Sequence, residues 1–285
     1  MVNDLMPSPR NIFITGCSSG IGLASATYLA QNGFTVFASV RKAADADRLR
    51  SLQEPNLIPI CPLDLTRPED IPLAVDQVRA LLNRLGQDSL YALINNAGGG
   101  SVAPLELMDP EIFRQELLTR LAGPVALVQA LLPLLRQGHG RIVWISTPGT
   151  IPTPYVASIH ACDFATNCIA RTLEIELKPW GIPCIQVRCG GIKTTKGLQT
   201  TTEAAAILQH PRGDLYRERL DKWARDMAEF DEKRTEPEQV ARLVGKVLLT
   251  SHPRRRYSIG HMSTAAAFLE ILPQSLTDAI LKARF

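Results

Sequence analysis

The sequence predicts a single doubly wound α/β domain, with a parallel sheet of about seven strands and helices on both of its faces. Short apolar runs rich in β-branched residues alternate along the chain with amphipathic segments of ten or more residues, as in right-handed βαβ units. A glycine-rich turn directly follows the first apolar run. Over the 285 residues we find no composition break, internal repeat or low-complexity segment that would mark a second domain, so one domain is expected over 1–285.

The expected strands are short apolar runs that end at turn-forming residues. They are expected at 11–15, 34–40, 56–65, 90–98, 140–146, 182–191 and near 255–260. The expected helices have apolar residues at a helical period, and Gly33 ends the first of them. They are expected at 21–33, 43–53, 68–86, 109–136, 155–178 and 236–251, with an apolar tail helix over 266–285. Strands separated by helices of this length indicate a parallel sheet that is covered on both faces.

The composition is that of a soluble globular protein, with 45% hydrophobic and 21% charged residues and a net charge of +3. The densest basic segment, "HPRRRY" at 252–257, is too small to indicate nucleic-acid binding. We expect no membrane span, because no apolar stretch approaches the ~20 residues that one needs. The N-terminal "MVNDLMPSPR" resembles neither a signal peptide nor an anchor. The six cysteines show no metal-ligand spacing, which favours reduced thiols, no metal site and a cytoplasmic protein.

The segment "TGCSSGIG" (15–22) lies between the first expected strand and the first expected helix. Glycines at such a turn allow the backbone to approach a pyrophosphate, and the free N–H groups of the helix N-terminus bind its charge. A plain turn that binds nothing is the alternative. The strand before it and the helix after it favour a dinucleotide site.

These eight residues fit T-G-x-x-x-G-I-G, so the chain resembles the short-chain dehydrogenases/reductases. "LDL" (63–65), "NNAG" (95–98) and "CGGIKT" (189–194) resemble further motifs of that family, with Cys189 in place of a proline. The tail resembles the branch that contains 17β-hydroxysteroid and retinol dehydrogenases. The resemblance runs from residue 11 to the C-terminus and implies that Asn95 stabilises the sheet.

The resemblance also implies which residues contact a nicotinamide dinucleotide. They are Gly16, Ser18, Ser19, Gly20, Ile21, Gly22, Arg41, Asp64, Leu65, Asn96, Ala97, Gly98, Tyr155, Gly190, Ile192 and Thr194. An acid after the second strand would bind a free ribose 2′-hydroxyl, but Val40 stands there, followed by Arg41 and Lys42. Arginine binds phosphate with two parallel hydrogen bonds, so NADP(H) is favoured over NAD(H). The alternative is that both cations simply begin a solvated helix.

The catalytic tetrad of this family is Asn, Ser, Tyr and Lys. "YVASIHA" (155–161) resembles Y-x-x-S-K-x-A, which assigns the acid/base role to Tyr155 and places Ile159 where the lysine is expected. Arg120 stands at the asparagine position, three residues before a helix glycine. Either Ser146 or Thr147 takes the serine position. The loop from there to Tyr155 is shorter than usual in the family by about four or five residues, which bears on where the Tyr155 helix enters the site.

Loss of the lysine removes the charge that lowers the tyrosine pKa, and general acid–base catalysis typically contributes ~10²–10⁴-fold. Arg120 lies in an apolar helical stretch and therefore needs a partner. We expect that partner to be the Tyr155 hydroxyl, the ribose region of the cofactor or the substrate. His160 and Asp163 receive no catalytic role.

The sequence thus predicts an NADP(H)-binding oxidoreductase of non-standard mechanism that reduces a carbonyl or imine of a hydrophobic small molecule. A redox-neutral cyclase or isomerase, or a non-catalytic binding protein with a structural dinucleotide, is the alternative. The resemblance implies that 194–235 and 263–285 form a substrate lid and a C-terminal helix. It also implies a homodimer or homotetramer that pairs through the helices at 109–136 and 155–178.

Overall fold

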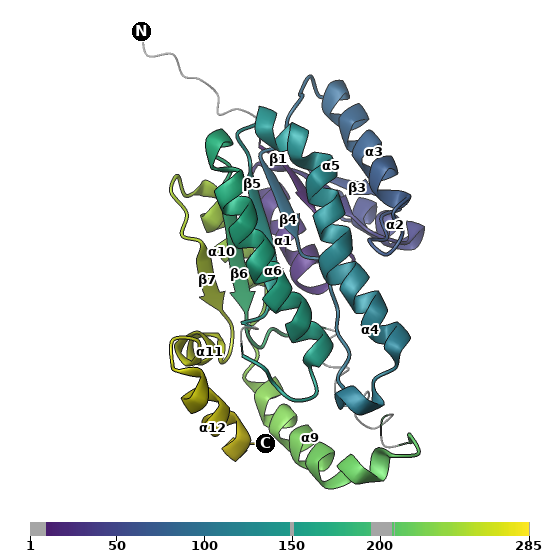
Figure 1. Ribbon diagram of the computed structural model, residues 1–285. Helices are drawn as coiled ribbons and strands as arrows, with labels where there is room; N and C mark the ends of the chain where they lie inside the picture. Colours follow the sequence, from purple (N-terminus) through teal and green to yellow (C-terminus); the bar gives the residue numbers. More distant parts are fainter. Residues whose placement is uncertain (1–9, 149–150, 195–206, 208, 285) are drawn as a thin grey trace.

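The computed structural model describes residues 10–148, 151–194, 207 and 209–284. Its seven strands form one sheet in the order β3-β2-β1-β4-β5-β6-β7, and all neighbouring strands are parallel. The strands are β1 (Asn11–Ile14), β2 (Thr35–Ser39), β3 (Leu57–Ile60), β4 (Ala92–Asn95), β5 (Arg141–Ser146), β6 (Cys184–Cys189) and β7 (Arg256–Ile259). The predicted doubly wound α/β fold is confirmed (Figure 1).

The helices alternate with these strands. They are α1 (Gly20–Gln31), α2 (Ala43–Ser51), α3 (Asp70–Arg84), α4 (Pro110–Leu117), α5 (Gly123–Gln137), α6 (Ala157–Glu176), α9 (Arg217–Glu232), α10 (Pro237–Leu249), α11 (Ser263–Leu269) and α12 (Gln274–Arg284). The helix predicted over 109–136 consists of α4, a π-helical turn at Leu118–Ala122, and α5. Such turns often occur at functional sites, and Arg120 lies in this one.

Two hydrophobic layers hold the sheet, because successive strand residues point to opposite faces. Ile12 and Ile14 pack with residues of α1, α2 and α10, whereas Phe13 packs with residues of α3, α5 and α6. Figure 1 shows α3, α5 and α6 in front of the sheet and α1 and α10 behind it.

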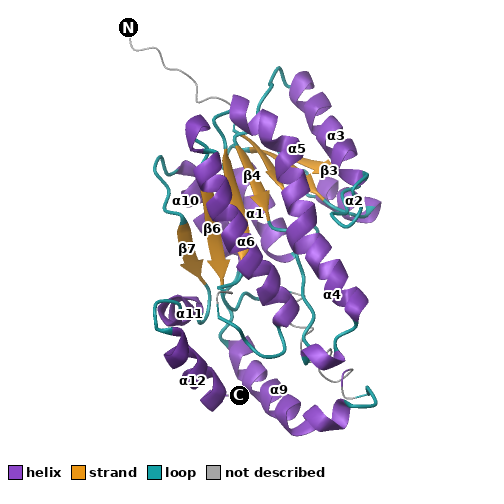
Figure 2. Cartoon of the chain, in the orientation of Figure 1, coloured by secondary structure: helices purple, strands orange, loops and turns teal. Residues whose placement is uncertain are grey.

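Helices α9, α11 and α12 lie beyond the carboxyl ends of β6 and β7, below the sheet in Figure 2. The end of α11 is anchored to β6 by a buried ion pair in which Arg188 Nη1 lies 2.5 Å from Glu270 Oε1. Only part of the predicted lid can be compared with the structure, since 195–206 and 208 lie outside the described residues. The described part of 209–235 contains α9, which packs beside the loop that follows β6: Phe230 and Arg234 border Gly191.

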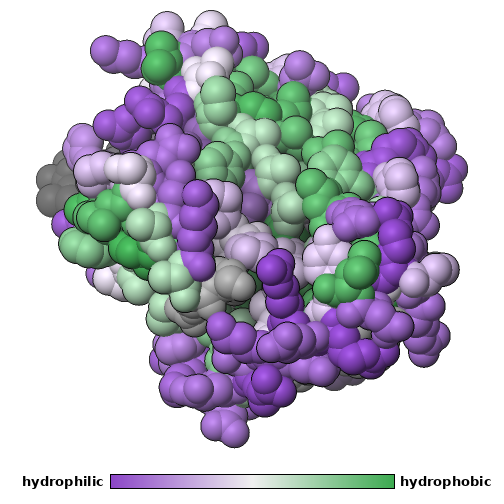
Figure 3. Space-filling view, turned by 60° about the horizontal axis from the view of Figure 1, so that its bottom comes forward, coloured by the Kyte–Doolittle hydropathy of each residue, from purple (hydrophilic) through white to green (hydrophobic). Residues whose placement is uncertain are grey.

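The continuous helix Pro110–Gln137 is long and apolar enough, by length and composition, to cross a membrane. In this fold it belongs to the helical layer on the sheet, where α5 packs with α3 and β4. Figure 3, in which the bottom of Figure 1 comes forward, shows apolar side chains gathered across the upper half of the visible face.

Candidate active site

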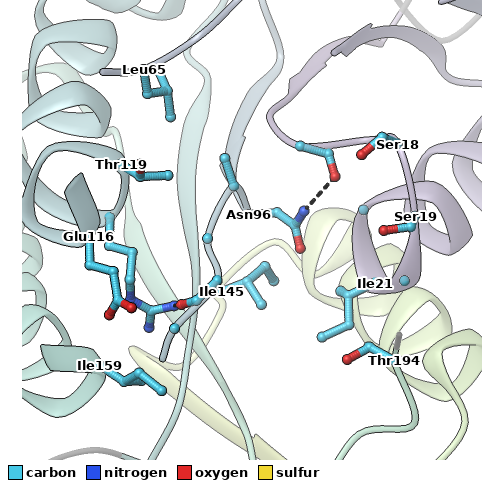
Figure 4. Close-up of a pocket in the computed structure, with 18 of the residues that line it drawn as sticks. Ser18, Ser19, Ile21, Leu65, Asn96, Glu116, Thr119, Ile145, Ile159 and Thr194 are labelled. Atoms are coloured by element: carbon cyan, nitrogen blue, oxygen red, sulfur yellow. Dashed lines mark hydrogen bonds between the residues drawn. The ribbon is translucent and has the colours of Figure 1, made fainter. Parts of the chain in front are cut away.

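A cavity of about 650 Å³ opens at the carboxyl ends of the strands, where ligands bind in open α/β sheets. Its wall includes every residue predicted to contact the dinucleotide except Tyr155, together with Arg120, Ser146 and Thr147. The residues predicted for the cofactor site thus come from five separate segments of the chain and line one cavity. Figure 4 shows Ser18, Ser19, Ile21 and Thr194 on one side of this cavity and Glu116 and Ile159 on the other.

The glycine-rich turn is built so that its backbone borders the cavity. Gly16 has a φ of +72°, and a Cβ there would lie 2.8 Å from Ala97 Cα. A Cβ on Gly22 would collide with Gly16 O and the Asn96 side chain. Asn96 Nδ2 donates to Thr15 O at 2.8 Å, and Thr15 Oγ1 accepts from the N–H of Ala97 at 2.9 Å. The turn and the segment after β4 are thus fixed to each other, with the N-terminus of α1 facing the cavity.

The residues after β2 and β3 border another part of the cavity. Val40 is buried, and the side chain of Arg41 is 67% exposed, with Nη1 4.0 Å from Asp64 Oδ2. Asp64 Oδ1 accepts hydrogen bonds from Thr66 N–H and hydroxyl groups at 3.0 and 2.8 Å. The first charged side chain after β2 is therefore a cation with room to bind an anion. A second cation, Arg48, donates to the carbonyl of Ser18 in the glycine-rich turn.

Tyr155 does not lie where the sequence motif places it. It precedes the first residue of α6, has a φ of +69°, and is not among the residues that line the cavity. Its ring packs edge-on against Trp223 of α9, with centroids 6.2 Å apart, and burial raises the pKa of its hydroxyl. The structure does not bring this phenol to the other predicted catalytic residues.

Ile159, one helical turn further along α6, lines the cavity instead. Its side chain packs so closely against Gly100 that a Cβ at that position would collide with it. Asp163 lies one turn beyond Ile159 on the same face and contacts both Arg120 and Thr147. A four-residue shift of the motif along the helix also removes the apparent shortening of the preceding loop. Ile159 and Asp163, rather than Tyr155 and Ile159, therefore stand at the two helix positions that the tyrosine and lysine of the family motif would take, and of the two Ile159 lines the cavity.

Arg120 has a partner that the sequence analysis did not assign to it. Its Nη2 lies 2.9 Å from Asp163 Oδ1, and its Nη1 donates to the carbonyl of Gly99 at 2.8 Å. The side chains of the pair are 14% and 6% exposed. We expected Arg120 to pair with Tyr155, the cofactor or the substrate, and the choice of Tyr155 is wrong because that ring lies outside the cavity. Asp163 lies on the same helix face as Ile159, which was the available sequence signal for its position. Its pairing with Arg120 was not predictable, because the two residues are 43 positions apart in the sequence.

The structure distinguishes Ser146 from Thr147. Thr147 donates its backbone N–H to Asp163 Oδ2 at 3.1 Å and its hydroxyl to the same oxygen, so it belongs to the Arg120 network. Ser146 ends β5, and its buried hydroxyl has no hydrogen-bond partner among the described residues. Ser146 is thus the hydroxyl that remains available to a ligand. Cys189 also lines the cavity, but burial raises the pKa of its thiol to about 12, which leaves it protonated and inert at neutral pH.

Glu116 of α4 is a cavity residue that sequence reasoning missed. Its Oε1 accepts a hydrogen bond from Ser101 N–H at 2.5 Å, while its buried Oε2 has no hydrogen-bond partner among the described residues. The sequence signal that could have identified it is its spacing from Arg120: the two residues are four positions apart on one helical segment and therefore lie on the same face. Within the described part of the chain, no group of three or more His, Cys, Asp or Glu side chains is arranged to hold a metal ion.

Comparisons with known proteins agree with this geometry. The family model for short chain dehydrogenases matches residues 10–205. The uncharacterized oxidoreductase YbbO of Escherichia coli K12 is 31% identical over 278 residues, which cover 96% of this chain and 94% of that protein. Human 11-beta-hydroxysteroid dehydrogenase type 2 is 31% identical over 97% of this chain and 70% of its own length. A short-chain dehydrogenase from Streptomyces avermitilis has the same fold, with a TM-score of 0.77 at 23% identity over 98% of this chain and 99% of that one.

The parallel sheet, the glycine-rich turn and the cavity at the carboxyl ends of the strands define a protein of the dinucleotide-binding oxidoreductase class. More particularly, the chain belongs to the short-chain dehydrogenase family. Its similarity to 11-beta-hydroxysteroid dehydrogenase type 2, and to mouse retinol dehydrogenase 5 at 28% identity over 97% of this chain and 89% of that protein, places it near the steroid and retinol dehydrogenase branch.

Proposed function

We propose that this protein is an NADP(H)-dependent oxidoreductase that reduces a carbonyl or imine group of a hydrophobic small molecule by a non-standard mechanism. One observation carries the proposal: the residues predicted to contact a dinucleotide, apart from Tyr155, line one cavity, yet Ile159 lies at its wall and Asp163, one turn further along α6, pairs with Arg120. None of the described residues that line the cavity is a tyrosine, lysine or histidine.

The residues present fit a dinucleotide. Gly16 and Gly22 leave no room for side chains beside Ala97 and Asn96, which keeps the backbone of the turn open to a pyrophosphate at the N-terminus of α1. Asp64 and Ala97 would line the adenosine, and Ile192 and Thr194 the nicotinamide carboxamide and phosphates. When bound, the nicotinamide supplies the hydride chemistry, and the protein supplies position and electrostatics.

Support for NADP(H) over NAD(H) comes from charge. No acid ends β2. Arg41 lines the cavity directly after it, and Arg48 donates to the carbonyl of Ser18 in the glycine-rich turn, so both cations would attract a 2′-phosphate. A structurally similar short chain dehydrogenase from Burkholderia cenocepacia (TM-score 0.72, 20% identity) was solved in complex with NADP. At 20% identity that protein is evidence for a shared fold alone. The proposed preference of this chain for NADP(H) therefore rests on Arg41 and Arg48.

The reaction end of the cavity sets limits on the substrate. Ile145, Ile159 and Ile192 give it apolar walls, and Ser146 offers one free hydroxyl. Isoleucine at position 159 cannot donate a proton to a carbonyl oxygen as a phenol would. A substrate that needs little acid assistance, such as an activated imine, suits these walls best.

The test is to incubate the protein with NADPH and each member of a panel of aldehydes, ketones and cyclic imines. Oxidation of NADPH is measured as the loss of absorbance of the reduced nicotinamide at 340 nm. Calorimetric titration with NADPH, and mass spectrometry of ligands that copurify with the protein, complete it. We expect reduction of at least one class, with imines ahead of ketones. Tight NADPH binding without oxidation by any member of the panel, or by the copurified ligand, would contradict the proposal.

A second candidate function follows from the same observation, that no tyrosine or lysine is among the described residues of the cavity wall. The dinucleotide would then be structural, and the chain a redox-neutral cyclase, isomerase or binding protein. In that case the copurified ligand should be returned with its oxidation level unchanged after incubation with NADPH or NADP⁺.

A further inference from the structure

We propose that Glu116 is the anionic contact for a cationic substrate, an iminium ion whose C=N bond is reduced at the end of the cavity next to Ile159. The inference rests on the proposed NADP(H)-dependent function and assigns to it a substrate class and a catalytic residue. Two separate features support it, namely an unpaired carboxylate and a missing proton donor.

The first feature is the position of Glu116. Its carboxylate accepts one hydrogen bond, from the N–H of Ser101, and that residue directly follows Gly100, on which Ile159 packs. Glu116 and Ile159 therefore flank two consecutive residues of one loop and line the same part of the cavity, as Figure 4 shows. The buried Oε2 has no hydrogen-bond partner among the described residues, and Glu116 forms no ion pair with any of them.

The charges around it do not compensate Glu116. Arg120 is the cation on the same helical segment, but Asp163 neutralises it at 2.9 Å, and its other terminal nitrogen donates to Gly99 O. One negative charge is left at this end of the cavity. A carboxylate removed from bulk water is unfavourable unless a cation pairs with it, so the cavity selects a ligand that brings a positive charge.

The second feature concerns the proton. Reduction of a ketone requires a proton on the oxygen as the carbon accepts a hydride, and the described wall has no tyrosine, lysine or histidine to supply it. An iminium ion requires none. Its carbon accepts the hydride from the reduced nicotinamide, a C–H bond forms, and the π electrons of C=N become the nitrogen lone pair of a neutral amine. Glu116 stabilises the cation before transfer and holds it at the cavity.

The experiment uses the permanently cationic N-methyl-3,4-dihydroisoquinolinium ion as substrate and cyclohexanone as the neutral comparison. Three proteins are compared: wild type, Glu116→Gln and Glu176→Gln. Glutamine keeps the shape of the side chain and can still accept from Ser101 N–H. Glu176 is exposed at the end of α6 and does not line the cavity, which makes it the matched control. Binding of the product amine as its ammonium ion to the NADP⁺-loaded protein is measured by calorimetry, so that a readout exists without turnover.

We expect the iminium ion to be reduced and cyclohexanone not. In Glu116→Gln, kcat/KM for the iminium ion and affinity for the ammonium ion should both fall by about tenfold to a hundredfold, the loss typical of a charged hydrogen-bonding partner. NADPH affinity should not change, and Glu176→Gln should match wild type. Equal iminium reduction by wild type and Glu116→Gln would overturn the inference while leaving the proposed oxidoreductase in place. Ammonium binding that depends on Glu116 without any turnover would support the anionic site and overturn the redox function.

Discussion

The Arg120–Asp163 ion pair should contribute more to the stability of this protein than any exposed pair. Arg120→Met removes the cation and leaves a carboxylate that is 6% exposed, although Asp163 keeps its two hydrogen bonds from Thr147. Removing one partner of a buried ion pair typically costs about 3–5 kcal/mol of folding free energy. Because Asp163 keeps its hydrogen bonds from Thr147, we expect the lower end of that range, a loss of about 3 kcal/mol. A loss of 1 kcal/mol lowers Tm by about 2–4 °C in a domain of this size, so the expected decrease is about 6–12 °C.

Thermal and urea unfolding of Arg120→Met, Asp163→Leu, their double variant and Arg114→Met would test this expectation. The double variant Arg120→Met/Asp163→Leu leaves no unpaired charge and should recover at least half of the loss. Arg114→Met is the matched control, since Arg114 Nη2 lies 2.7 Å from Glu111 Oε1 but the two side chains are 59% and 57% exposed. An exposed pair of this kind contributes about 0–1 kcal/mol.

Two results would refute the reasoning. The first is that Arg120→Met is no more destabilising than Arg114→Met, and the second is that the double variant loses as much stability as the sum of the two single substitutions. In either case the pair would not be acting as a buried, mutually neutralised unit. Loss of turnover in an Arg120 variant is informative only after its unfolding has been measured.

Three further predictions concern the cofactor, pH and assembly. Arg41→Ala should weaken NADPH binding by at least tenfold, equivalent to ~1.4 kcal/mol, and leave NADH binding unchanged; equal effects on both in calorimetric titration would contradict the 2′-phosphate role. Burial is the main cause that lowers the pKa of His160, so the folded protein keeps it neutral while the unfolded chain takes up a proton below pH ~6.5. The contribution of neutral His160 to stability should therefore be complete above that pH and be lost as the pH falls toward the lowered pKa of the folded state. Between pH 7.5 and 5.5, Tm should fall less in His160→Gln than in the wild type, and equal decreases in the two proteins would argue against this role. Phe164 and Ile175 of α6 are 42% and 72% exposed, which supports a homodimer or homotetramer, and a monomer by light scattering at micromolar concentration would exclude it.

The residues predicted for the cofactor site come together at one cavity because the determinants of that prediction are local. A glycine-rich turn between a strand and a helix specifies backbone geometry within eight residues, and the structure brings Gly16, Ser18 and Gly22 to the cavity as expected. The parallel sheet follows from the same kind of local pattern, repeated along the chain.

The placement of Tyr155 in the cavity was predicted wrongly because of helix periodicity, whereas Arg120, Ser146 and Thr147 do line it. Residues four positions apart lie on one face of a helix, so a motif can be shifted by one turn without disturbing its pattern of small and apolar residues. Tyr155 fits the motif in the sequence, yet the polypeptide enters α6 only after it. The short loop was the visible sign of the shift. The pairing of Arg120 with Asp163 spans two elements, and no local pattern specifies it.

The replacements in this cavity fit one another as a set, which is why restoring one residue should not restore a ketone reductase. A Cβ on Gly98 would lie 2.8 Å from Arg120 Nη1, and a Cβ on Gly100 would collide with Ile159, so the loop after β4 is shaped to these two side chains. Lysine in the variant Ile159→Lys would enter a wall fitted to isoleucine. The only tyrosine of the motif would still pack against Trp223, outside the cavity. We therefore expect Ile159→Lys to leave ketone reduction at the wild-type level in the NADPH assay, and a vigorous ketone reductase would show that the shifted position of α6 is wrong.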